Sequence, residues 1–160
     1  MPTFRGGIAV IGLLLLFIGT GCDRKPCENN DCVNSSCFEG ECICDAGFEG
    51  KNCQVQSRDR LLGAWLVGDI CRPAAEVYEL NILPGEAKNE IVFDNLGKTG
   101  ILVTGEVNKF EIIISAQSFK QGSISGAGGI DQAARIISIE YEVDDGNGNV
   151  DFCQAAFHVL

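Results

Sequence analysis

The chain has few of the residues on which catalytic and nucleic-acid-binding sites usually depend. Its 160 residues include one histidine, His158, which lies in an apolar C-terminal segment without a serine–histidine, cysteine–histidine or paired-carboxylate motif. Acid–base and metal chemistry draw heavily on histidine. Lysine and arginine total 12 against 22 aspartates and glutamates, and the formal net charge of −10 repels phosphates and anionic lipid head groups. We therefore expect a non-catalytic protein with no cofactor, no metal and no nucleic-acid partner.

The chain also lacks an apolar run long enough to span a bilayer comfortably. Its most apolar run, Ile8 to Ile18, has 11 residues and follows the basic residue Arg5. A membrane-spanning helix needs about 20 apolar residues, whereas a short run after a positive charge is typical of a signal peptide. Residues 1–21 are therefore predicted to be a signal peptide, whose removal leaves 11 basic and 22 acidic residues.

Cysteine, in contrast, is abundant. Six of the nine cysteines form the run Cys27-x4-Cys32-x4-Cys37-x4-Cys42-x-Cys44-x8-Cys53. A segment this short cannot bury enough apolar surface to fold alone, so cross-links must hold it, and disulfides persist only in oxidising compartments. Zinc is the competing use of such cysteines, but no histidine lies in the run and an exported chain favours oxidation. The run predicts a protein outside the cytoplasm.

The spacing of this run, together with the turn Gly47-Phe48-x-Gly50, resembles an EGF-like module, which we expect over residues 22–54. The resemblance implies that the glycines adopt positive φ and that Phe48 packs on a small sheet. Calcium-binding members carry an acidic signature before the first cysteine; Asp23-Arg-Lys-Pro26 lacks it, so no calcium is expected. The implied disulfides are Cys27–Cys37, Cys32–Cys42 and Cys44–Cys53.

The predicted signal peptide ends in Gly19-Thr20-Gly21-Cys22, which is similar to the lipobox of bacterial lipoproteins. In that family the cysteine is acylated and becomes the N-terminus, which implies membrane attachment through a lipid on Cys22. Six cysteines belong to the module and two others can pair, so Cys22 is the odd thiol of an exported chain. Gly19 stands where the family usually has leucine, so ordinary cleavage after Gly21 and secretion remain the alternative.

The last hundred residues predict antiparallel strands and no convincing helix. Alternation is clearest over 137–143, where Ile137, Ile139, Tyr141 and Val143 share one face. The other candidate strands are 65–71, 77–83, 90–95, 100–107, 110–116, 119–126 and 150–160. Turn signals separate them at Pro84-Gly85, 95–97, Asn108-Lys109, Gly128-Gly129 and 144–149.

This pattern indicates an all-β domain over residues 61–160, joined to the module by the polar linker 55–60. Cys71 ends the first expected strand and Cys153 lies in the last. A bond between them would join the two strands that become neighbours when an eight-stranded antiparallel meander closes into a barrel. A two-sheet β-sandwich is the alternative, because alternation alone does not distinguish closure from face-to-face stacking.

The first expected strand opens with Gly63-Ala64-Trp65, which is similar to the Gly-x-Trp at the start of lipocalin-like barrels. The resemblance implies that Gly63 and Trp65 form the floor of the barrel. It also implies a carrier of small apolar ligands, lined by inward residues. These are Tyr78, Leu80, Phe110, Ile112, Ile139 and Tyr141, which serve first as core, because small barrels are often filled by side chains.

Two loops resemble binding motifs less closely. Asp145-x-Asn147-x-Asn149-x-Asp151 places oxygen side chains as the first half of an EF-hand loop does, but Val150 replaces its invariant glycine. A glycine-rich hairpin turn explains these residues with fewer assumptions. The segment 126–129, Gly-Ala-Gly-Gly, is not followed by the lysine and helix of a phosphate loop, and we expect it to end a strand.

Three functional hypotheses follow from the sequence. The preferred one is a non-catalytic lipoprotein of the cell envelope that presents a binding or adhesion domain, on an EGF-like spacer, to a protein or glycan partner. The alternative is a carrier of a small apolar ligand inside the barrel. An enzyme remains tenable only if carboxylates such as Asp69, Glu79 and Glu140 converge in a cleft.

Overall fold

The computed structural model describes residue 27 and residues 32–71, 74–120, 122–131, 133 and 135–160. The predicted signal peptide, the predicted lipidation site Cys22 and the segment 23–26 lie outside the described residues. Within the described part no helix has the length and apolar character needed to cross a membrane.

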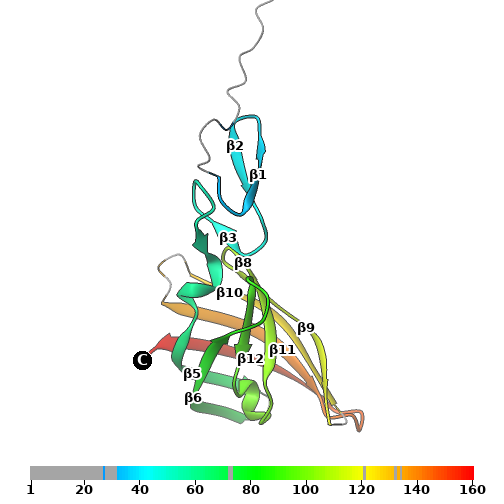
Figure 1. Cartoon of the computed structure of the whole chain (residues 1–160). Helices are drawn as coiled ribbons and strands as arrows, with labels where there is room; N and C mark the ends of the chain where they lie inside the picture. Colours follow the sequence, from blue (N-terminus) through cyan, green and yellow to red (C-terminus); the bar gives the residue numbers. More distant parts are fainter. Residues whose placement is uncertain (1–26, 28–31, 72–73, 121, 132, 134) are drawn as a thin grey trace, which may run out of the picture.

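The chain forms a small disulfide-rich module followed by a β-barrel (Figure 1). The module contains two two-stranded sheets, and its strands are β1 (Ser35–Phe38), β2 (Glu41–Cys44), β3 (Phe48–Glu49) and β4 (Val55–Gln56). It is held by three disulfides, Cys27–Cys37, Cys32–Cys42 and Cys44–Cys53, the same pairs that the EGF-like spacing implies. Gly47 and Gly50 adopt φ of 82° and 87°, in the region expected of them.

Eight antiparallel strands then close into a barrel, which confirms the all-β barrel and excludes the sandwich. The first four strands are β5 (Gly63–Cys71), β6 (Ala74–Pro84), β7 (Glu90–Phe93) and β8 (Val103–Asn108). The last four are β9 (Glu111–Phe119), β10 (Gly122–Ile130), β11 (Ile136–Asp144) and β12 (Val150–Val159). A short 3-10 helix, η2 (Leu96–Lys98), connects β7 to β8.

Closure occurs where β12 pairs with β5, and Cys71 stands directly opposite Cys153 in that pairing. The two residues form a fourth disulfide, with 4.2 Å between their Cα atoms. As the strand pattern predicts, the bond joins the first and last strands of the barrel. Four disulfides in one chain indicate an oxidising environment outside the cytoplasm.

Two sequence-based boundaries are wrong. The expected strand 119–126 is shifted toward the C-terminus: Phe119 ends β9, the chain turns, and the strand that contains residues 122–126 is β10, which continues to Ile130. The glycine segment 126–129 is neither a turn nor a strand end; it lies inside β10. Its glycines are needed where neighbouring backbone comes close, since a Cβ on Gly128 would overlap the carbonyl oxygen of Ser138 in β11.

The expected linker, residues 55–60, is folded. Its first two residues form β4, and the remainder form the 3-10 helix η1 (Ser57–Arg60). The Arg58 guanidinium donates from Nη1 to the backbone oxygens of Gly85, Ala87 and Glu90 at 3.1, 2.6 and 3.0 Å, in and beside the β6–β7 loop. η1 is thereby fastened to the barrel.

The module is attached to the other side of η1. The Ser57 amide donates to the Gly47 carbonyl at 2.8 Å, and Arg60 forms an ion pair with Glu49. Gly47 also lies against Asn89 of the barrel, so closely that a Cβ on it would stand 2.5 Å from the Asn89 Cβ. We call this set of contacts the joint. It replaces a flexible linker with packed contacts, a property that sequence composition did not indicate.

Candidate functional site

The inside of the barrel is filled by side chains. One cluster of buried apolar residues includes four of the expected inward residues, which are Leu80, Ile112, Ile139 and Tyr141, and Tyr78 packs against it. Phe110 is a correction: it is exposed in the turn before β9, with the Arg60 guanidinium 4.9 Å from its ring centroid. The packed cluster favours a role in the core for these residues over a role in lining a ligand cavity.

Gly63 and Trp65 begin β5 near the joint. Trp65 is buried in the core, and its indole N–H donates to the Leu61 carbonyl at 2.7 Å. Gly63 has φ of 125°, a conformation that favours glycine. The tryptophan thus packs inside the barrel with its polar atom satisfied, as the sequence motif predicts, and this packing by itself assigns no ligand.

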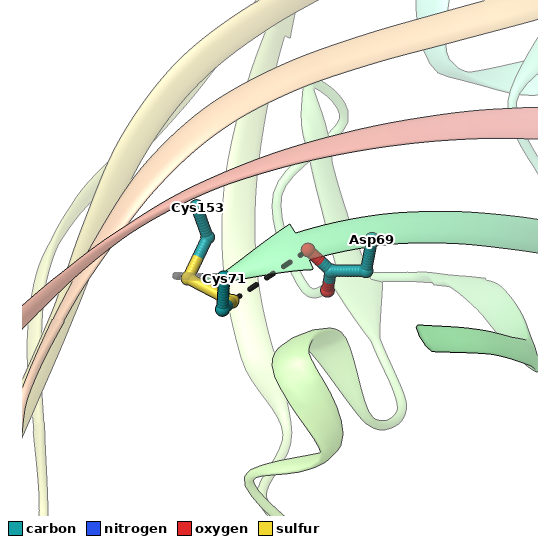
Figure 2. Close-up of side chains that lie close together, drawn as sticks. All are labelled: Asp69, Cys71 and Cys153. Carbon is teal, nitrogen blue, oxygen red and sulfur yellow. Dashed lines mark hydrogen bonds between the residues drawn. A yellow bond between two sulfur atoms is a disulfide. The ribbon is translucent and has the colours of Figure 1, made fainter. Parts of the chain in front are cut away.

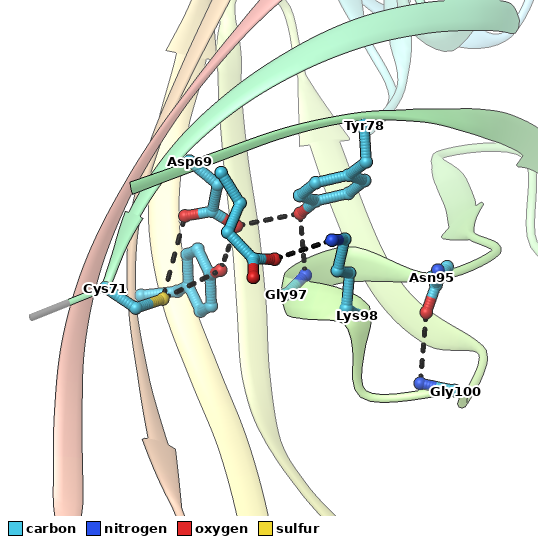
Figure 3. Close-up of polar contacts among 9 residues, drawn as sticks. Asp69, Cys71, Tyr78, Asn95, Gly97, Lys98 and Gly100 are labelled. Carbon is cyan, nitrogen blue, oxygen red and sulfur yellow. Dashed lines mark hydrogen bonds and ion pairs between the residues drawn. The ribbon is translucent and has the colours of Figure 1, made fainter. Parts of the chain in front are cut away.

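A polar cluster interrupts the core near the far end of β5. Asp69 points inward and only 4% of it is exposed. One of its carboxylate oxygens, Oδ2, accepts hydrogen bonds from the hydroxyls of Tyr78 at 2.7 Å and Tyr141 at 2.5 Å. The Gly97 amide of η2 donates in turn to the Tyr78 hydroxyl at 2.8 Å, as Figure 3 shows. Strands β5, β6 and β11 and helix η2 together build this cluster.

The electrostatics of the cluster keep both phenols protonated. Burial raises the pKa of Tyr78 and of Tyr141 well above the ordinary tyrosine value, and the hydrogen bonds to Asp69 raise both further. Both groups therefore remain hydrogen-bond donors across the physiological pH range. A carboxylate oxygen that receives two such donors is held firmly in place.

The second carboxylate oxygen of Asp69, Oδ1, has a different neighbour. It lies 3.7 Å from the Cys71 sulfur, the contact drawn in Figure 2. Cys71 is bonded to Cys153, so its sulfur carries no hydrogen and cannot donate. Asp69, Cys71 and Cys153 lie close enough together to resemble a metal-ligand group, but disulfide sulfurs are not the thiolates that metals bind. Oδ1 thus has no donor among the described residues.

A cleft of about 370 Å³ opens beside this oxygen. Asp69, Cys71 and Tyr78 contribute to its inner wall, and Glu76, Lys98 and Asp151 contribute charges. The Lys98 ammonium pairs with Glu76 at 2.7 Å and lies 5.6 Å from the centroid of the Tyr78 ring. Both partners of this ion pair are about half exposed, so it belongs to the mouth of the cleft.

A second candidate site lies on the outer surface of the barrel, over β5, β10, β11 and β12. Two adjoining hollows of about 640 and 720 Å³ share Ile70, Glu140 and Gln154 in their linings. The larger side chains there are exposed, with 55% of Ile70 and 69% of Phe152 accessible to solvent. The floor is formed in part by small residues, namely Gly68, Ala127, Ser138 and Ala156. We call this surface the outer groove.

Acidic groups border the outer groove. Glu140, Glu142 and Asp151 line it. Glu140 accepts a hydrogen bond from the Gln154 amide at 3.1 Å, and Glu142 accepts one from the Ser125 hydroxyl at the same distance. No lysine or arginine is among the described residues that line the two hollows. The groove therefore combines apolar surface with negative charge.

The three carboxylates considered in the sequence analysis, Asp69, Glu79 and Glu140, do not converge in one cleft. Asp69 points into the barrel, whereas Glu79 and Glu140 are exposed on its outer face, on β6 and β11. His158 is exposed near the end of β12, opposite Leu66 and Ile136 in the neighbouring strands. The arrangement of the described residues thus offers hydrogen bonds, apolar contact and charge, which are means of binding.

The Asp145 loop connects β11 to β12 and uses its own polar groups. The Asp145 carboxylate accepts from the side chain of Asn149 at 2.7 Å and from the backbone amides of Asn147 and Asn149 at 2.7 and 3.2 Å. These hydrogen bonds, that of the Asn149 side chain first, hold the pKa of Asp145 below its usual value. The geometry is that of a hairpin turn stabilised by an aspartate, the simpler interpretation of the sequence pattern.

The sequence analysis did not single out the cluster around Asp69, although a signal was present. Trp65, Val67 and Cys71 share the inward face of the first strand, and the same alternation places Asp69 on that face. Burial of an acidic residue in a core-facing position costs free energy unless the residue has hydrogen-bond partners, so its presence there marks a polar cluster.

The sequence matches no protein-family model and no curated protein.

Proposed function

We propose that this protein is a non-catalytic lipoprotein of the cell envelope. In this proposal a lipid on Cys22 anchors the chain, the disulfide-rich module is an EGF-like spacer, and the barrel binds a protein partner. The four disulfides and the cysteine spacing support an exported protein with such a spacer. The joint supports a spacer that holds the barrel at a defined position.

The observation that carries the binding function is the outer groove. Monomeric soluble proteins rarely leave large contiguous apolar patches exposed, and such patches mark interaction sites. Here Ile70 and Phe152 are exposed beside hollows, and Val77, 68% exposed, lies on β6 opposite Gly68 of the groove floor. The groove offers apolar area and carboxylates, so the partner it fits is a protein segment with both apolar and basic side chains.

The groove is tested by photo-crosslinking in the intact envelope. A photoreactive phenylalanine analogue at Phe152 is expected to form a covalent adduct with one protein, identified by mass spectrometry. An added Ile70→Asp substitution should reduce the adduct yield at least about tenfold, because a charged group would have to be desolvated in the contact. Leu102→Asp, which alters another exposed apolar residue outside the groove, should leave the yield unchanged.

The crosslinking result contradicts the proposal if Ile70→Asp forms as much adduct as the unsubstituted protein. An adduct that contains only carbohydrate would also contradict it and would indicate a glycan partner. Thermal unfolding of each variant provides the folding control, because substitutions at exposed positions are expected to change stability by about 0.5 kcal/mol or less.

The lipid anchor is tested separately with Cys22→Ser. We expect the native protein to partition into the detergent phase and the variant to move to the aqueous phase, because the variant has no thiol to acylate. Cys44→Ser with Cys53→Ser is the matched control, since it removes two cysteines of the module, leaves the barrel disulfide intact and should leave partitioning unchanged. If Cys22→Ser still segregates with the detergent, the lipoprotein assignment is wrong.

A further inference from the structure

The cleft at the end of the barrel contains a buried acceptor to which none of the described residues donates. Asp69 is more than nine-tenths buried, and both tyrosine hydroxyls are directed to Oδ2. Oδ1 lies 3.7 Å from the Cys71 sulfur, which belongs to a disulfide and cannot donate a hydrogen bond. A buried carboxylate oxygen that receives no hydrogen bond is costly, so this position is favourable for a ligand that brings a donor.

The charges around the cleft specify the sign of that ligand. Its described lining contains three carboxylates, those of Asp69, Glu76 and Asp151, and one cation, Lys98. The Lys98 ammonium already pairs with Glu76, which leaves the lining with two negative charges in excess of positive ones. An anion would be repelled, whereas a cation gains Coulomb energy in a partly desolvated site.

The Tyr78 ring adds apolar surface to the cleft. The Lys98 ammonium already lies over one face of this ring, 5.6 Å from its centroid, so that face gives no further attraction to an entering cation. Tyr78 and Asp69 both line the same cleft, so a ligand that reaches the carboxylate can place an alkyl chain near the ring. Its volume of about 370 Å³ is within the range of small-molecule sites.

We infer that this cleft binds an alkylammonium group, with Asp69 Oδ1 as the hydrogen-bond acceptor and the Tyr78 ring as an apolar surface for the alkyl chain. The proposed outer groove is not required for this site. A guanidinium is less suited, because it pairs best with both oxygens of a carboxylate and Oδ2 is already engaged by two hydroxyls. A metal ion is also less suited. Among the described residues, the group of possible metal ligands that includes Asp69 contains only the two sulfurs of a disulfide besides its carboxylate.

The two tyrosines provide a selective reporter. The chain contains only Tyr78 and Tyr141, and both donate to Asp69. In the mature chain with its disulfides oxidised, we expect butylammonium to shift the NMR signals of ring-labelled tyrosine in a saturable manner. Neutral n-butanol, which has nearly the same shape, should bind at least about tenfold more weakly, as should butylguanidinium.

Variants of matched charge test the role of Asp69. Asp69→Asn keeps an acceptor for the tyrosines and removes the charge, and it should weaken butylammonium binding at least about tenfold. Glu79→Gln removes one charge on the exposed outer face of β6 and should leave binding unchanged. The comparison of butylammonium with n-butanol needs no variant, so it remains decisive if Asp69→Asn does not fold.

Two further ligands distinguish the source of the ammonium. N-acetyl-lysine amide presents a side-chain ammonium, as a protein partner would, and glycinamide presents a free α-amine. Binding of either supports the inference and identifies its source. The inference is overturned if butylammonium produces no saturable shift, if n-butanol binds equally well, or if Asp69→Asn binds as the unsubstituted protein does. None of these outcomes bears on crosslinking at the outer groove.

Discussion

Replacement of Cys71 and Cys153 together by alanine is expected to lower the free energy of unfolding of the barrel by about 4 kcal/mol. The disulfide spans 82 residues of sequence, and in the chain-entropy model closure of so long a loop restricts the unfolded chain by about this amount. The bond also lies at the seam where β12 meets β5, so its loss removes a covalent restraint on barrel closure.

Chemical denaturation followed by tryptophan fluorescence measures this effect directly, because the single tryptophan, Trp65, is buried in the barrel. Removal of Cys44 and Cys53 is the matched control. Their disulfide spans nine residues and lies in the module, so the barrel transition should be nearly unchanged. A loss below about 1 kcal/mol in the Cys71 and Cys153 variant would show that the seam is held by strand pairing alone.

Gly47→Ala is expected to release the module from the barrel. The added Cβ would lie 2.5 Å from the Cβ of Asn89 and 2.8 Å from its Cα, so one of the two segments has to move away. The positive φ adds a backbone cost of about 1 kcal/mol for a residue with a side chain. Because Gly47 also accepts the Ser57 amide, the movement disturbs the first residue of η1.

Nuclear spin relaxation measures the change, since two parts that tumble together share one rotational correlation time. We expect a common value for module and barrel in the native protein and two different values in Gly47→Ala. Gly50→Ala is the control, because it has nearly the same φ, and its added Cβ would meet only Val55 of the module, at 3.8 Å. Equal loosening in both variants would attribute the effect to backbone strain and not to the contact with Asn89.

The sequence predicted the fold where a local rule determines the structure. Alternation located most strands, glycine and asparagine pairs located most hairpins, and parity placed Cys71 opposite Cys153. Closure required more, because alternating strands fit a sandwich equally well and only the pairing of β12 with β5 excludes it. The segment 126–129 was expected to end a strand because glycine is a weak strand former. Its glycines lie inside β10 because the backbone of β11 comes too close for a side chain, and this approach is known only from the structure.

The candidate sites were less predictable than the fold. Phe110 was assigned to the interior because it stands at the start of an alternating run, but the strand begins one residue later and Arg60 covers its ring. The alternation of β5 predicts that Asp69 points inward. Its hydrogen-bond partners could not be predicted, because they come from β6 and β11, and β11 is far away in sequence. The outer groove depends on which small residues lie side by side on four strands, and this is known only once the register of the strands is fixed.

The three carbonyl oxygens that hold Arg58 have a mechanical consequence for a tethered protein. Tension that arrives along the chain from the module reaches η1 before it reaches β5. At η1 the Arg58 guanidinium transmits part of the force to the β6–β7 loop through its hydrogen bonds. The force is therefore not applied to β5 alone, whose hydrogen bonds to the neighbouring strands would otherwise break one after another. In the proposed lipoprotein, this attachment is suited to resist tension between the lipid anchor and the barrel.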